Sequence, residues 1–127
     1  MSVNVSENAE DFRAKEFIRS LVNLAKRSSH QNRVDFDMIR IDENVIITAQ
    51  DHYPSIELFA IYENPPEGYV EQKLVRRFEE PSRFGKYFIG KDKNKNVLVF
   101  ERIDIDSLDE FTVHKSIKDI TRFISTN

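Results

Sequence analysis

The feature that most constrains this fold is a set of predicted strands with apolar side chains on both faces. An antiparallel sheet that is covered on one face should alternate apolar inward and polar outward residues. Segment 56–62 breaks that rule, because Ile56, Leu58, Ala60 and Tyr62 point to one side while Phe59 and Ile61 point to the other. Segments 45–47 and 97–100 behave in the same way. The sheet must therefore be covered on both faces, or it keeps apolar area for a partner.

The periodicity of the remaining residues predicts the order of the elements. Apolar residues recur at helical spacing in the first and last parts of the chain, and period-two runs separated by polar turns lie between them. The last helix is predicted to begin with a capping box made by Ser107 and Glu110. The expected elements are a helix over 8–27, strands near 34–41, 45–50 and 56–62, a short helix over 70–80, strands near 87–90 and 97–105, and a helix over 107–125.

These elements define the fold class as α+β. We expect an antiparallel five-stranded sheet with three helices in the order α-β-β-β-α-β-β-α. A chain of 127 residues fits one domain with one core. We therefore predict a disordered N-terminal lead over residues 1–7 and a single domain over residues 8–127.

The supply of helices limits how much of the sheet can be covered. Two long helices can cover one face, whereas the middle helix is too short to cover the whole of the other. The simpler alternative is that each two-faced strand is central and buried on both sides. Large exposed apolar patches usually mark protein contacts. The sequence therefore favours a protein that binds other protein chains.

No pattern in the sequence supports an enzyme or a cofactor site. There is no Cys, only 3 Gly are present, and the three histidines lack the spacing of a metal site. Asp35 and Asp37 share one strand face and could hold a divalent cation, but a solvated edge strand is the better interpretation. We expect no catalytic residue, no bound metal and no cofactor.

Charge and hydropathy bound the surroundings of the chain. The net charge is −3 and the pI is near 5.6, which argues against nucleic acid as the main partner. No apolar run approaches the roughly 20 residues of a membrane span. The first eight residues lack the pattern of a signal peptide. We therefore expect a cytoplasmic protein with no membrane span.

The element order and the ending of the chain resemble a known family, the class I chaperones of bacterial type III secretion. The likeness covers residues 8–125 and rests on the layout, on the strand over 97–100, on the helix start over 105–111, and on the closing amphipathic helix over 120–124. The sequence departs from the family in its middle helix. That helix has fewer leucines than usual and meets Pro81 early.

The resemblance implies a function in bacterial virulence and a set of contact residues. Such chaperones are cytoplasmic homodimers that bind the N-terminal segment of a secreted effector protein and keep it extended and competent for secretion. The middle helix and neighbouring strands form the dimer contact, which maps to Val70, Leu74, Val75, Phe78, Val97 and Val99. The effector contacts involve the first helix and the sheet, which maps to Phe17, Phe36, Met38, Ile47 and Leu58.

One alternative of a different class stays open at this point. A small acidic protein can also be an inhibitor or immunity protein that binds and blocks a folded toxin or enzyme. That alternative predicts a folded partner rather than an extended one.

Overall fold

The computed structural model describes residues 5–125, with side chains from residue 12 onward. Its elements are α1 (Val5–Arg27), β1 (Ile39–Arg40), β2 (Val45–His52), β3 (Ser55–Tyr62), α2 (Tyr69–Glu79), α3 (Pro81–Phe84), β4 (Phe88–Lys91), β5 (Val97–Asp104), the 3-10 turn η1 (Ile105–Ser107) and α4 (Glu110–Ser125). The predicted α+β class and element order are confirmed. Pro81 ends α2 as expected, and it also opens the additional single-turn helix α3.

The first helix begins earlier than the sequence suggested. α1 starts at Val5, so residues 5–7 of the predicted lead belong to the helix. Residues 1–4 of that lead and the last two residues of the predicted domain lie outside the described residues.

The five strands form one antiparallel sheet in the order β1-β2-β3-β5-β4. β3 lies at its centre between β2 and β5, and the register of these three strands brings residues of the same phase together across the sheet. Ile47, Ala60 and Val99 occupy one such row, and all three are fully buried. The core therefore lies on the face of the sheet to which this row points.

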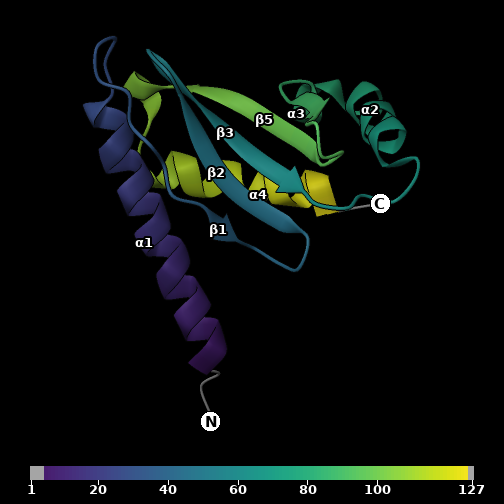
Figure 1. The fold of residues 1–127 in the computed structure, drawn as a ribbon, viewed down its shortest axis with the longest axis horizontal. Helices are drawn as coiled ribbons and strands as arrows, with labels where there is room; N and C mark the ends of the chain where they lie inside the picture. Colours follow the sequence, from purple (N-terminus) through teal and green to yellow (C-terminus); the bar gives the residue numbers. More distant parts are fainter. Residues whose placement is uncertain (1–4, 126–127) are drawn as a thin grey trace.

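Helices α1 and α4 cover that face of the sheet (Figure 1). Each contributes residues spaced three or four apart, which fall on one side of a helix. The buried apolar residues are Phe17, Ile18, Leu21, Val22 and Ala25 from α1 and Val113, Ile120, Phe123 and Ile124 from α4.

The first predicted strand is mostly not a strand. Only Ile39–Arg40 pairs with β2, although the alternation over 34–41 predicted a full partner. Side chains of β2 form hydrogen bonds with the segment before β1, where the predicted strand would have formed a backbone ladder. The Thr48 hydroxyl donates to the Asp37 carbonyl at 2.9 Å, and the Val34 amide donates to the Asp51 carboxylate at 3.4 Å.

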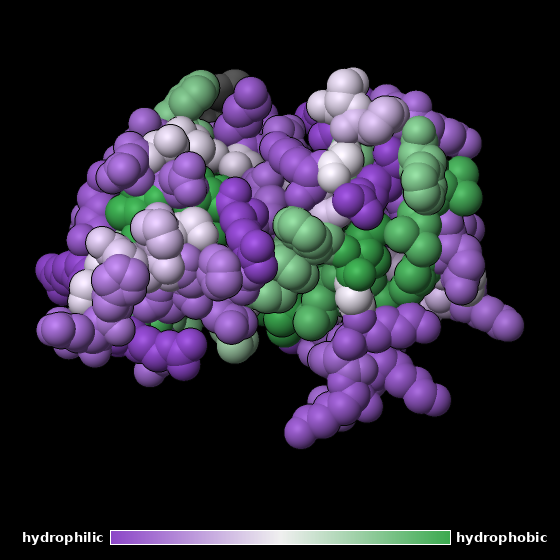
Figure 2. All heavy atoms as spheres, turned by 90° about the horizontal axis from the view of Figure 1, so that it is seen from above, coloured by the Kyte–Doolittle hydropathy of each residue, from purple (hydrophilic) through white to green (hydrophobic). Residues whose placement is uncertain are grey.

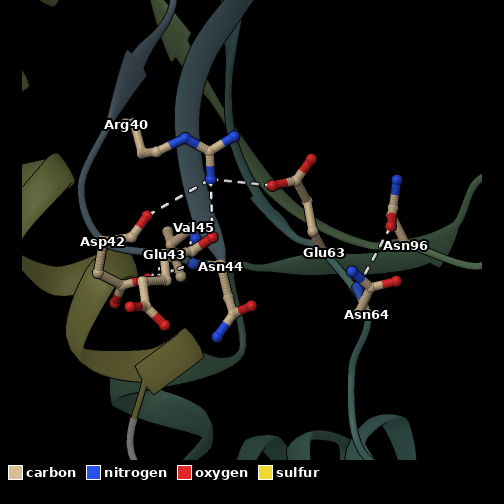
Figure 3. Close-up of polar contacts among 8 residues, drawn as sticks. All are labelled: Arg40, Asp42, Glu43, Asn44, Val45, Glu63, Asn64 and Asn96. Atoms are coloured by element: carbon tan, nitrogen blue, oxygen red, sulfur yellow. Dashed lines mark hydrogen bonds and ion pairs between the residues drawn. The ribbon is translucent and has the colours of Figure 1, made fainter.

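The turn between β1 and β2 is held by its own polar side chains (Figure 3). The Asp42 carboxylate accepts from the amides of Asn44 and Val45 at 2.8 and 3.0 Å. This is an Asx-turn, in which the side chain replaces a backbone acceptor. The Arg40 guanidinium pairs with the Glu63 carboxylate at 2.9 Å and so ties β1 to the end of β3.

The start of α4 differs from the prediction in the capping residue. Asp109 forms the cap, since its carboxylate accepts from the Thr112 amide at 2.7 Å and its carbonyl accepts from the Val113 amide at 3.0 Å. Ser107 belongs to η1, so the predicted capping box of Ser107 and Glu110 is wrong. The hydrogen bonds from Thr112 lower the pKa of the Asp109 carboxyl.

Candidate protein-binding surfaces

The face of the sheet opposite α1 and α4 is polar at one end, where Gln50, Glu57 and Arg102 lie side by side, and largely apolar over the rest. We call the apolar part the outer sheet face, made by Ile46, Phe59, Ile61, Phe88, Leu98 and Phe100. The ring centroids of Phe100 lie 4.8 Å from Phe59 and 5.0 Å from Phe88. These rings stack on one another, yet Phe88 stays 46% exposed. In a view from above, hydrophobic side chains gather at the middle and right of the molecule, on the side where α2 lies (Figure 2).

Helix α2 presents its apolar side to solvent. Leu74, Val75 and Phe78, which we call the α2 stripe, are 37%, 53% and 81% exposed. The buried residues of the helix are instead Tyr69 and Lys73. A helix on a folded domain normally buries its apolar side. The orientation of α2 therefore leaves an apolar stripe uncovered in the single chain.

Polar contacts to the end of α4 explain this orientation. The Tyr69 hydroxyl donates to the Ile124 carbonyl, and the Lys73 ammonium donates to the Phe123 carbonyl at 2.7 Å. The last carbonyls of a helix have no partner within it, so α2 supplies their donors. The Lys73 nitrogen also lies 5.1 Å from the centre of the Tyr69 ring and 5.6 Å from that of Phe123. These contacts hold the polar side of α2 against the body.

Burial changes the acidity of these groups. It lowers the pKa of the Lys73 ammonium to about 8, and repulsion from Arg76 acts in the same direction. It raises the pKa values of Tyr69 and Tyr87 above their ordinary range. Between pH 8 and 10 the unfolded chain binds a proton at Lys73 that the folded chain has lost, so stability rises with pH. Above pH 10 the stability falls again with pH, because Tyr69 and Tyr87 lose their protons in the unfolded chain and keep them in the folded chain.

We therefore expect the free energy of unfolding to rise by about 1–2 kcal/mol between pH 8 and 10. Lys73→Met should remove this rise, because it removes the titrating group while keeping a long side chain. Urea titrations of both proteins at several pH values measure the difference, in which all other titrating groups cancel. Equal slopes against pH for the two proteins would contradict the assignment.

A hollow lies between the N-terminal half of α1 and residues 37–39. It has a volume of 580 Å³ and is lined by Phe12, Phe17, Met38 and Ile39 together with polar residues of α1. We call it the Met38 hollow. Figure 1 shows α1 extending past the sheet at its N-terminal end. Phe12 and Met38 are 65% and 66% exposed, so an apolar side chain of a partner could reach both.

The structure separates the predicted effector-contact residues. Phe17 and Met38 come together in the Met38 hollow, while Phe36 lines a smaller hollow of 320 Å³ beside Ala49. Ile47 and Leu58 are fully buried under α1 and α4. These two cannot touch a partner in the described conformation, because their strand phase points into the core.

The predicted dimer residues divide in a similar way. The α2 stripe is exposed, and Val70 is half-buried. Val97 and Val99 are fully buried, and their neighbours Leu98 and Phe100 face outward in their place. Sequence reasoning assigned the wrong phase of β5, and it did not select Phe88. The opposed apolar residues of β3 were the signal for the outer sheet face.

In the part of the chain that the structure describes, few side chains are grouped in a way that suits catalysis or metal binding. None of its clusters of His, Asp and Glu has the three or more members that could hold a metal ion. Asp35 and Asp37 are both exposed. His30 packs edge-on against the Tyr53 ring at 4.6 Å. Over residues 5–125, no helix combines the length and apolar character that crossing a membrane requires.

Comparison with known proteins supports the fold. No protein-family model and no curated protein sequence matches the chain. A chain in the solved structure of the HopA1–SchA chaperone–effector complex aligns over 97% of this chain and 95% of its own length. The TM-score is 0.57 and the sequence identity is 16%. The resemblance predicted from the sequence is thereby confirmed at the level of the fold.

Proposed function

We propose that this protein is a type III secretion chaperone that holds a segment of a secreted effector protein in an extended, secretion-competent form. The observation that carries the proposal is the Met38 hollow, an exposed apolar site between two elements that the fold itself does not cover. The shared fold with a chain of a chaperone–effector complex supports the same conclusion.

The geometry of the surface suits an extended partner. Apolar side chains of the partner can enter the Met38 hollow, where Phe12 and Met38 offer contact area. β1 pairs only with Ile46 and Ile47. Residues 34–37 lie beside the rest of that edge of β2 and are held there by side-chain hydrogen bonds, so the anchors offered to a partner are apolar side chains. Ordering a flexible segment costs entropy, so several anchors are needed for useful affinity.

The proposal includes a homodimer. The α2 stripe and the outer sheet face are both apolar, and α2 lies beside the sheet rather than over it (Figure 1). Contact between two copies through these surfaces would bury Val75, Phe78 and Phe88. Their exposure does not stabilise a single chain, and exposed apolar patches usually mark protein contacts. A two-fold axis would then bury the same surfaces on both copies.

The functional surface is tested by Met38→Glu. We expect the variant to bind the co-purifying partner segment at least about tenfold more weakly, because a carboxylate in the hollow would be desolvated by the partner's apolar side chain. Asn23→Glu adds the same charge at an exposed site of α1 outside the hollow and serves as the control. The affinities are measured by calorimetry with the segment that co-purifies from the native cell. Equal affinity for the two variants would rule out the Met38 hollow as the site.

A further inference from the structure

The segment before β1 runs along the edge of β2 without pairing with it. We call residues 34–38 the strap. The Ile41 amide donates to the Val45 carbonyl at 2.9 Å, and β1 continues the same register. Hydrogen-bonded pairs alternate along an antiparallel ladder, so the register would next join Asp37 to Ala49. The ladder does not include that pair, so the strap stays outside the sheet.

A side chain of β2 replaces the missing backbone bond. The Thr48 hydroxyl donates to the Asp37 carbonyl at 2.9 Å. In a regular ladder that carbonyl would accept from the Ala49 amide. Residues 33–36 and 49–51 line the hollow of 320 Å³ described above, which lies between the strap and β2. The Thr48 bond therefore holds the strap at the edge of the sheet but away from the ladder.

The position of the strap determines the side of the sheet on which Met38 lies. Side chains alternate between the two faces along a strand. In a continued ladder, Met38 would pair with Thr48 and share its face, which is the face of Phe59. Helix α1 covers the opposite face. Met38 instead lines the Met38 hollow together with Phe12 and Phe17 of α1. The hollow therefore depends on a strap that stays out of the ladder.

Thr48 acts on the Met38 hollow from outside it. It is half-buried, and the hollow is lined by other residues, including Asp37 and Met38. The second side-chain bond to the strap, from the Val34 amide to the Asp51 carboxylate, is longer at 3.4 Å and lies at the far end of the strap. The Thr48 bond is therefore the one that fixes the wall of the hollow next to Met38.

We propose that Thr48 is a positioning residue for the partner site, whose hydroxyl keeps the strap out of the ladder and so keeps Met38 beside α1. This inference rests on the proposed function, because it concerns the same site. It adds that the affinity for the partner segment depends on a residue that the segment does not touch.

Thr48→Val removes the hydroxyl and keeps the branched shape that suits a strand. We expect it to bind the partner segment about fivefold more weakly, a factor that corresponds to one ordinary hydrogen bond, because only molecules with the strap in place can bind. Thr48→Ser keeps the hydroxyl and should restore the affinity. Thr121→Val is the matched control, since the buried Thr121 hydroxyl has no hydrogen-bond partner among the described residues. Calorimetry measures the affinities with a synthetic peptide of the segment that co-purifies.

The methyl group of Met38 reports the position of the strap without any partner. The chain has only 2 Met, so isotope labelling of methionine methyl groups gives a simple spectrum, in which Met38→Leu identifies the signal. The rings of Phe12 and Phe17, which line the same hollow, influence its chemical shift. We expect the signal to move in free Thr48→Val and to keep its position in the other two variants.

Weaker binding and a moved Met38 signal in Thr48→Val, both restored in Thr48→Ser, are the expected results. Wild-type affinity in Thr48→Val, while Met38→Glu binds weakly, would overturn the positioning role and leave the proposed function standing. Equal losses in both Thr48 variants, or a loss without a moved signal, would also overturn it. If no segment co-purifies, or if Met38→Glu binds normally, the proposed function is wrong, and the Met38 signal alone decides whether Thr48 positions the strap.

Discussion

Replacing Val75 and Phe78 together with Glu is expected to turn the proposed homodimer into a monomer. The two side chains are 53% and 81% exposed in the single chain, so the substitution removes no core contact. In a dimer through the α2 stripe they would be buried, and two buried carboxylates facing their symmetry copies would weaken association at least about 100-fold. Light scattering across a concentration series measures the change.

The control for this variant lies on the same helix. Gln72→Glu adds charge at an exposed position outside the α2 stripe, and it should leave the dimer intact. Circular dichroism should show the same helix content in all three proteins. A double variant that stays dimeric, or a wild-type protein that is monomeric at all concentrations, would place the contact elsewhere or exclude it.

Phe123→Ala should be among the most destabilising single substitutions in the chain. The Phe123 ring is fully buried, and its centre lies 4.9 Å from that of Phe84 and 5.0 Å from that of Tyr87. Its backbone carbonyl also accepts a hydrogen bond from the Lys73 ammonium, so the region around Phe123 joins α4 to α2 and α3. Truncating a buried Phe costs about 3–5 kcal/mol through lost burial and the cavity that remains. Urea unfolding measures the loss.

Phe111→Ala is the matched control, because it is the same substitution on the same helix. Phe111 is 77% exposed, so its truncation should change stability by no more than about 0.5 kcal/mol. The pair separates a core role from a surface role. Similar losses for both variants would mean that the packing of α4 differs from the structure described here.

The order of elements followed from the sequence because periodicity and turn chemistry are local. The apolar stripe of α4 and the Asx-turn at Asp42 are both set within a few residues. The choice of buried face was not local. In β5, Val97 and Leu98 are equally apolar, so only packing against α1 and α4 decides that Val97 is buried and Leu98 faces outward.

The apolar periodicity of α2 could not predict its orientation for a related reason, although the family resemblance had placed its apolar side in a contact between subunits. Its pattern predicts that Leu74, Val75 and Phe78 share one side of the helix, which is confirmed. A surface helix normally turns its apolar side toward the core, so periodicity alone predicts that this side faces inward. Hydrogen bonds from Lys73 and Tyr69 to the end of α4 depend on residues 50 or more positions away. Apolar periodicity contains no information about such contacts. The same limit applies to β1. There the Thr48 hydroxyl donates a hydrogen bond to the Asp37 carbonyl, which would accept from a backbone amide in a regular ladder.

The most direct test of the account is hydrogen–deuterium exchange of the partner within the complex purified from the native cell. A chaperone for an extended segment predicts protection over one contiguous N-terminal stretch of the partner, which exchanges like an unfolded chain when it is separated from this protein. Protection spread over a folded domain that keeps its own protection when alone would contradict the account. That result would favour a protein that blocks a folded toxin or enzyme.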